Sequence, residues 1–116
     1  MDAPVPVMVQ RFAEHLGVRF DERLEAVTLF GSYARGEANE DSDLDVLVVL
    51  RNLSRSEKVE AIEMAAELSV GQPITLHALV MSDVEHQRLR SLEARLVQDI
   101  DEEGIPVLGP GKQDRT

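Results

Sequence analysis

The chain lacks cysteine and tryptophan, and its 116 residues include only three phenylalanines and one tyrosine. Without cysteine it can form no disulfide, use no thiol nucleophile and hold no cysteine-ligated metal. With so few aromatic rings it offers no evident platform on which nucleic-acid bases could stack. These absences predict an aliphatic core and argue against a base-binding surface.

Positive charge is also scarce, because 12 Lys and Arg residues stand against 22 Asp and Glu residues, a formal net charge of -10. Broad binding to a phosphate backbone depends on Lys and Arg, so we expect no direct nucleic-acid partner, and an acidic surface suits a basic protein better. No apolar run approaches the roughly 18 residues of a membrane helix, and the first residues do not read as a signal peptide. We therefore expect a cytoplasmic protein with no membrane partner.

The length suits one domain, which we place at residues 1–109, with a loose tail at 110–116. Apolar periodicity, together with the capping-box spacing of Ser54 with Glu57 and of Ser82 with Glu85, predicts an α/β (α+β) fold, a small mixed sheet of three to four strands with helices packed on it. The predicted order is a helix that starts near Val5 and ends at Gly17, strands at 24–30 and 44–50, a helix from Ser54 to Gly71, a strand at 74–81, a helix from Ser82 to Gly104 and a candidate edge strand at 105–108.

Spacing also predicts which side chains face the core. The strands at 24–30 and 44–50 are apolar at most positions, as expected of central strands. The two later helices each show an apolar stripe, and the third strand alternates. The predicted buried sets are Val59, Ile62, Ala65, Ala66 and Ser69 on the first of these helices, Leu89, Leu92, Leu96 and Ile100 on the second, and Ile74, Leu76, Ala78 and Val80 on the strand.

Two aspartates, Asp43 and Asp45, begin the second strand. Residues two apart on a strand point to the same face, so both carboxylates converge. They repel each other unless a cation lies between them, and hard divalent ions such as Mg²⁺ prefer such oxygen ligands. The alternative is that the aspartates are ordinary polar residues at the solvated start of a strand.

Gly31 and Ser32 follow the first strand directly. A phosphate can approach a backbone closely where a side chain is absent, and the N–H groups of a following helical turn favour an anion. Ser32 would add a hydroxyl. The alternative is an ordinary turn that Gly36 closes.

Taken together, Gly31-Ser32, ten residues and then Asp43-x-Asp45 form a specific pattern, which here contains Ala34-Arg35-Gly36 and places Ser42 before the first aspartate. The pattern resembles the signature of the polymerase-beta-like nucleotidyltransferase superfamily. It is most similar to the minimal nucleotidyltransferases that act as antitoxins beside HEPN-domain toxins. The direct match covers about residues 24–50.

The resemblance implies transfer of AMP from ATP to a hydroxyl, in family terms a tyrosine of the cognate HEPN toxin. Asp43 and Asp45 would be the catalytic carboxylates that hold Mg²⁺, and Gly31 and Ser32 would grip the β and γ phosphates. The same pattern implies that Ser42 and Arg35 belong to the nucleotide site. Arg35 would contact phosphate or brace the loop through a carboxylate, and we favour bracing.

Many active relatives place a third carboxylate on the next core strand, yet no Asp or Glu occurs within 74–81. His77 is the candidate for that position, since a neutral histidine can accept a proton or bind a metal. The alternative is a partly buried histidine that bonds to a neighbour.

Three functions follow from these observations. The first is a Mg²⁺-dependent enzyme that adenylylates a HEPN-type toxin, with which it would form a hetero-oligomer. The second is an antitoxin that is catalytically weak or inactive and neutralises the toxin by binding, which the missing carboxylate favours. The third is a small-molecule nucleotidyltransferase, whose pocket this short chain could build only as an oligomer.

Overall fold

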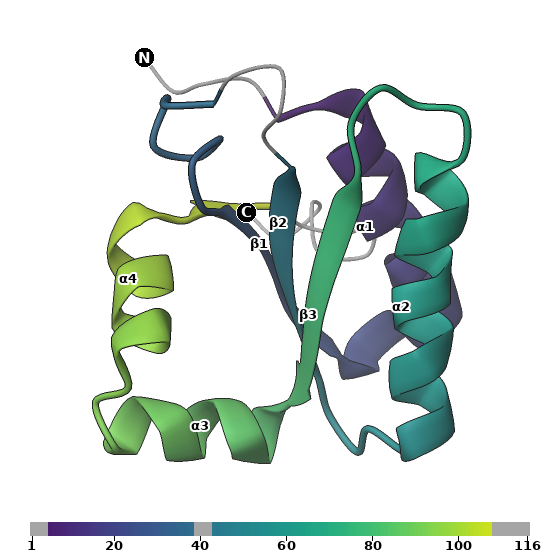
Figure 1. The fold of residues 1–116 in the computed structure, drawn as a ribbon. Helices are drawn as coiled ribbons and strands as arrows, with labels where there is room; N and C mark the ends of the chain where they lie inside the picture. The colour runs from purple at the N-terminus through teal and green to yellow at the C-terminus, as the bar shows by residue number, and fades with distance from the viewer. Residues whose placement is uncertain (1–4, 39–42, 108–116) are drawn as a thin grey trace.

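The computed structural model describes residues 5–38 and 43–107. Its strands form one mixed sheet with helices on both faces, which confirms the predicted α+β class (Figure 1). In chain order the elements are α1 (Val7–Phe20), the short 3₁₀ helix η1 (Asp21–Arg23), β1 (Leu24–Phe30), β2 (Leu44–Leu50), α2 (Arg55–Ser69), β3 (Leu76–Ser82), α3 (Asp83–Ser91), α4 (Arg95–Glu103) and β4 (Ile105–Pro106).

The four strands lie in the order β3-β2-β1-β4. β1 pairs antiparallel with both β2 and β4, whereas β2 and β3 are parallel and are joined through α2, as a parallel pair requires. The bounds of β1 and β2 and their central positions are as predicted. β3 begins at Leu76 rather than residue 74, because the Leu76 N–H donates to the Ser69 Oγ at the end of α2.

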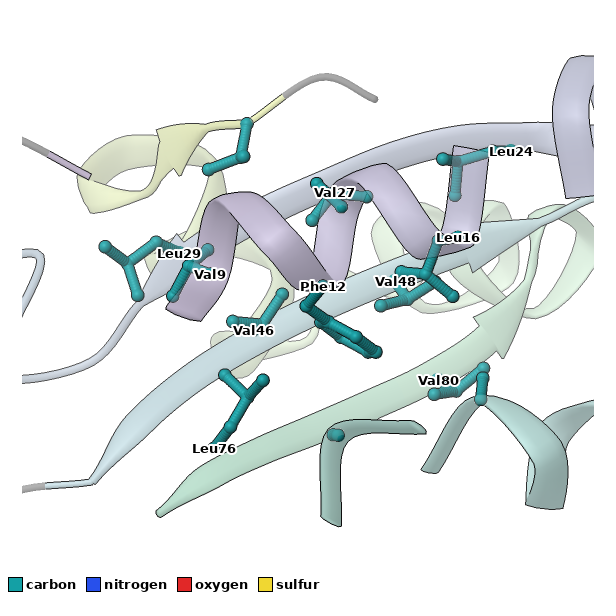
Figure 2. Packing of buried hydrophobic residues seen from close by; sticks show 14 of the residues in the cluster. Val9, Phe12, Leu16, Leu24, Val27, Leu29, Val46, Val48, Leu76 and Val80 are labelled. Carbon is teal, nitrogen blue, oxygen red and sulfur yellow. The ribbon is translucent and has the colours of Figure 1, made fainter. Parts of the chain in front are cut away.

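The core lies on both faces of the sheet. On the face that α1 and α2 cover, aliphatic side chains surround Phe12 (Figure 2). A second, smaller cluster of Leu47, Val49, Met81 and Ile100 lies on the face of α3 and α4. β2 contributes to both clusters, which is why nearly all of its residues are apolar. On β3, Leu76 and Val80 join the larger cluster as predicted.

α1 does not end at Gly17, as its sequence predicts, but continues to Phe20. Phe20 is buried, and the guanidinium carbons of Arg19 and Arg23 lie 4.7 and 5.7 Å from its ring centroid. Burial of this ring favours an additional turn of helix. The helix stops at Asp21, whose φ is 51°, and whose N–H donates to the Gly17 carbonyl.

α2 begins with the predicted capping box, in which Ser54 and Glu57 each accept the other's backbone N–H. Its predicted buried face is partly wrong. Ala65 is buried, together with Ala61, but Val59 and Ile62 are 48% and 42% exposed and Ala66 is also exposed. The buried side is rotated because Met64 and Leu68 also pack against the larger cluster.

The predicted helix from Ser82 to Gly104 is instead two helices, although the Ser82 cap at its start is present. The chain turns at residues 92–94, where Glu93 has a φ of 56°, and α4 leaves in a different direction from α3 (Figure 1). The predicted stripe is therefore wrong at Leu92, which is 65% exposed, and at Leu96. The turn lets Val97 and Ile100 of α4 pack in the core, where both are buried.

β4 confirms the predicted edge strand as a two-residue strand. Ile105 and Pro106 pair with β1, and the Val107 N–H donates to the Val27 carbonyl at 2.7 Å. Residue 108 and the predicted tail at 110–116 lie outside the described residues. The domain limits therefore stay predictions.

Candidate functional site

The predicted site residues meet where β1 ends and β2 begins. Antiparallel pairing places Phe30, the last residue of β1, opposite Asp45, and parallel pairing places His77 of β3 beside Asp45 on the other side. Asp43 directly precedes β2 and is exposed. The sheet register thus brings three segments that are distant in sequence to one end of the central strands.

Gly31 lies against the Asp45 carboxylate. Its φ is +81°, in the region that favours glycine, and a Cβ at this position would come within 2.5 Å of the Asp45 Oδ2. No side chain larger than hydrogen fits there unless the carboxylate moves. The glycine therefore lets the backbone turn approach the carboxylate closely.

The residues after Gly31 form a single helical turn. The Arg35 N–H donates to the Gly31 carbonyl at 3.2 Å, and the Glu37 N–H donates to the Ser32 carbonyl at 2.9 Å. Gly31 and Ser32 thus stand at the amino end of the turn, where backbone dipoles favour an anion. Ser42, the remaining predicted residue of this loop, lies outside the described residues.

The carboxylates and His77 influence one another. Burial raises the pKa of Asp45, His77 offsets part of this rise, and the Asp43 carboxylate adds to it. The His77 Nε2 lies 3.1 Å from the Asp43 Oδ2. His77 is 58% exposed rather than partly buried, so its ring is accessible while it contacts the first carboxylate.

Arg35 makes two carboxylate contacts. Its Nε donates to the Glu37 Oε1 at 3.0 Å, and its terminal nitrogen lies 3.6 Å from the Glu103 Oε1 at the end of α4. The hydrogen bond with Glu37 raises the pKa of Arg35 above its ordinary value. Through these contacts Arg35 links the loop to α4, which is the bracing role favoured from the sequence. Contact of Arg35 with phosphate stays a prediction.

A pocket of about 170 Å³ adjoins Gly31. The sequence did not predict most of its lining, because the contributing residues of α4 reach it only through the turn at residues 92–94. No local sequence signal would have identified them. The lining residues are Phe30, Gly31, Arg35, Leu96, Asp99, Ile100 and Glu103.

The donor set at this site suits a magnesium ion that arrives with a phosphate ligand. Within residues 5–38 and 43–107, no three His, Cys, Asp or Glu side chains are grouped so that they could hold a metal ion. Mg²⁺ does not require such a cage, since it commonly binds through one or two carboxylates, substrate phosphates and water. Asp43 and Asp45 beside the Gly31 turn fit that mode of binding.

Comparison with known proteins identifies similar chains. The nucleotidyltransferase domain family matches residues 10–105. A protein of Methanocaldococcus jannaschii whose name describes a protein adenylyltransferase is 25% identical over 101 residues, which are 86% of this chain and 95% of the relative. A second protein of that organism, with the same kind of name, is 42% identical over 41 residues, 35% of this chain and 41% of the relative.

Solved structures share the fold. A toxin–antitoxin crystal structure with AMP-PNP has a TM-score of 0.58 and 23% identity, and the match covers 90% of this chain and 77% of that chain. A nucleotidyltransferase structure from Sulfolobus solfataricus has a TM-score of 0.51 and 20% identity, over 86% of this chain and 76% of that chain. Among the helices of the described residues, none is long and apolar enough to cross a membrane.

Proposed function

Because the chain belongs to the nucleotidyltransferase domain family, we propose that it transfers AMP from ATP to a hydroxyl of a protein partner. The family match confirms the nucleotidyltransferase that the Gly31-Ser32 and Asp43-x-Asp45 motif indicates. The observation that carries the proposal is the approach of Gly31 to Asp45. It brings the turn that we propose as the phosphate site and the carboxylate that we propose as a metal ligand to the same point.

Each site residue has a distinct role in this proposal. Gly31 and Ser32 hold the β and γ phosphates, Asp43 and Asp45 hold Mg²⁺, and Arg35 keeps the loop in place from α4. Ser42 belongs to the nucleotide site by resemblance alone. Bound Mg²⁺ would neutralise charge on the phosphates and on the departing pyrophosphate.

The reaction itself is a displacement at phosphorus. The acceptor oxygen forms a bond to the α phosphorus of ATP, the bond to pyrophosphate breaks, and the acceptor hydroxyl loses its proton. We assign His77 as the group that receives this proton, because its exposed ring lies at the site and no Asp or Glu occurs on β3.

We further propose that the acceptor is a tyrosine of a HEPN-type toxin, in a hetero-oligomer formed in the cytoplasm. The similar structures include toxin–antitoxin complexes, and a net charge of -10 suits a basic partner.

A second candidate is an antitoxin that neutralises its toxin by binding alone. The absence of Asp and Glu from β3 favours it, because many active relatives have a carboxylate there. The two candidates differ in one measurable respect. Only the enzyme leaves AMP on the partner.

The test is transfer of label from α-labelled ATP with Mg²⁺, using the protein together with whatever protein co-purifies with it as the candidate toxin. We expect label on the toxin, and none with the Asp43→Asn/Asp45→Asn variant. The control is Glu14→Gln/Glu22→Gln, which removes the same charge at two exposed positions away from the site. Toxin that binds but stays unlabelled with Mg²⁺ and with Mn²⁺ would leave only the binding antitoxin.

A further inference from the structure

The two edges of the sheet differ in how well they are protected. β4 forms one edge with only two residues, one of which is Pro106. β3 forms the other edge with the seven residues LHALVMS, which include no proline, lysine or carboxylate. Proteins usually protect long edge strands with such residues, because an exposed edge pairs with other strands. β3 therefore lacks the residues that would discourage pairing with another strand.

The main chain of β3 has hydrogen-bonding groups on its free side. The Leu44 N–H donates to the Thr75 carbonyl at 2.9 Å, so in this parallel ladder residues 77, 79 and 81 direct their N–H and C=O groups toward β2. Ala78 and Val80 therefore direct theirs outward. Within the described sheet, no strand lies on that side of β3.

An apolar stripe on α2 runs beside this edge. It consists of Val59, Ile62 and Ala66, which share one flank of the helix and are exposed. The opposite flank of α2 faces α1, since Glu60 forms an ion pair with Arg19. The stripe thus lies on the flank away from α1, where α2 packs against β3 (Figure 1).

α2 and β3 lie side by side over their whole lengths, so the middle of the α2 stripe lies beside the middle of the β3 edge. At one end, the Ser69 Oγ of α2 accepts the Leu76 N–H of β3, and at the other end Arg55 and Ser82 line one pocket. The middle residue between Arg55 and Ser69 is Ile62, and the middle residue between Leu76 and Ser82 is Leu79. A single two-fold axis can therefore pass close to both.

Charges along α2 suit the same axis. Arg55 and Lys58 lie in its amino-terminal half, whereas Glu63 and Glu67 lie in its carboxyl-terminal half, and all four are exposed. Glu57 and Glu60 also lie in the amino-terminal half, but they form ion pairs with Arg23 and Arg19 on the other side of the helix. When two copies of α2 run antiparallel, Arg55 and Lys58 of each therefore lie toward the half of the other that carries Glu63 and Glu67. The surface is therefore complementary to itself, as a two-fold interface requires.

From these observations we propose that a second copy of this chain docks on the β3 edge. The two β3 strands run antiparallel about an axis near Leu79, so that Ala78 of each copy pairs with Val80 of the other and the sheets join into one. The α2 stripes meet at Ile62. This inference does not depend on the proposed function, because it rests on the outward main-chain groups of Ala78 and Val80 and on the α2 stripe, none of which has a role in the candidate site. His77, the one site residue on β3, directs its main-chain groups toward β2.

The experiment measures the mass of the full chain by light scattering and its dimer dissociation constant by sedimentation. We expect a dimer that Ile62→Glu weakens at least tenfold, since each substitution acts twice across the axis. Val18→Glu is the matched control, because Val18 is 81% exposed and lies on α1. Ala78→Pro removes an outward N–H and should weaken the dimer while the chain stays folded.

A charge exchange tests the orientation of the two copies. Lys58→Glu alone and Glu63→Lys alone should each weaken the dimer about fivefold, and the double variant should recover most of the loss. A chain that stays monomeric up to about 100 μM would overturn the proposal. So would a dimer that both Ile62→Glu and Ala78→Pro leave unchanged. If the chain is monomeric and Ala78→Pro instead abolishes toxin binding, the edge belongs to the toxin.

Discussion

Replacing Gly31 by alanine tests the close approach of the turn to Asp45. The substitution has two separate effects. It places a side chain on a residue with a φ of +81°, which costs roughly 1–2 kcal/mol, and it places a methyl group 2.5 Å from the Asp45 Oδ2. The second effect is cheap for stability, because the contacted atom ends a rotatable side chain. It is costly for function if that carboxylate must stay in place.

Gly36→Ala separates the two effects. Gly36 has a φ of +75° in the same loop, but a Cβ there would have no atom within 4 Å. Both variants should therefore lose about 1–2 kcal/mol of stability, a fall in melting temperature of roughly 4–8 °C for a chain of this size. Only Gly31→Ala moves the carboxylate. Because a displacement of about 1 Å at a reacting centre can cost about 100-fold, we expect a fall of that size in AMP transfer.

The assay pairs thermal unfolding with initial rates of label transfer at a temperature where both variants are folded. We expect similar melting temperatures, an about 100-fold slower rate for Gly31→Ala, and a rate within about threefold of the parent for Gly36→Ala. Equal rates in the two variants would refute the reasoning. The approach of Gly31 to Asp45 would then be a feature of packing and not of catalysis.

Three further predictions concern ionisable groups. Burial raises the pKa of Asp45, so its charged form destabilises the fold, and Asp45→Asn should raise the melting temperature at pH 7 while it abolishes transfer. Hydrogen bonds from Arg23 lower the pKa of Glu57 from 4.5 to about 2, so ionised Glu57 stabilises the fold above pH 4.5 and this stabilisation is lost as the pH falls toward 2. In urea unfolding, Glu57→Gln should lose less stability than the parent across that pH range. Burial and nearby Arg90 lower the pKa of His86, so the folded state favours its neutral form. The free energy of unfolding should therefore fall as the pH drops below about 6.5, and His86→Gln should reduce this fall in the same urea measurement.

Local signals in the sequence predicted the elements that local physics determines. The strands at 24–30 and 44–50 are apolar runs bounded by polar residues, and their bounds in the structure are those predicted. Ser54 and Ser82 were predicted as helix caps from the spacing of serine and glutamate, and both accept the expected N–H. In each case the deciding residues lie within four positions of one another.

The wrong predictions concern segments whose structure depends on contacts between residues that are distant in sequence. Leu92 and Leu96 continue a helical spacing, and residues 91–95 contain neither glycine nor proline, so nothing in the local sequence indicates the turn around Glu93. Burial of Val97 and Ile100 favours the turn. α1 likewise extends past Gly17 because Phe20 finds a buried position. Helix periodicity alone cannot predict such tertiary contacts.

The candidate site was likewise predictable from the sequence only in part. The motif placed Gly31 and Asp45 in one site from sequence, and antiparallel pairing of β1 with β2 brings them together. The contact between His77 and Asp43 depends on the parallel register of β3, and the pocket beside Gly31 depends on the return of α4. Neither arrangement could be read from the spacing of residues along the chain.

The position of the site at one end of the sheet separates the two proposals. In an antiparallel pair of β3 strands, the end of β3 that carries His77 lies against the opposite end of the second copy's β3. The two candidate sites would therefore lie at opposite ends of the joined sheet, and neither would contribute a residue to the other. A variant that disrupts the dimer, such as Ile62→Glu, should keep Asp45 and Gly31 in place. AMP transfer that persists in the monomer would show that each chain holds a complete nucleotide site.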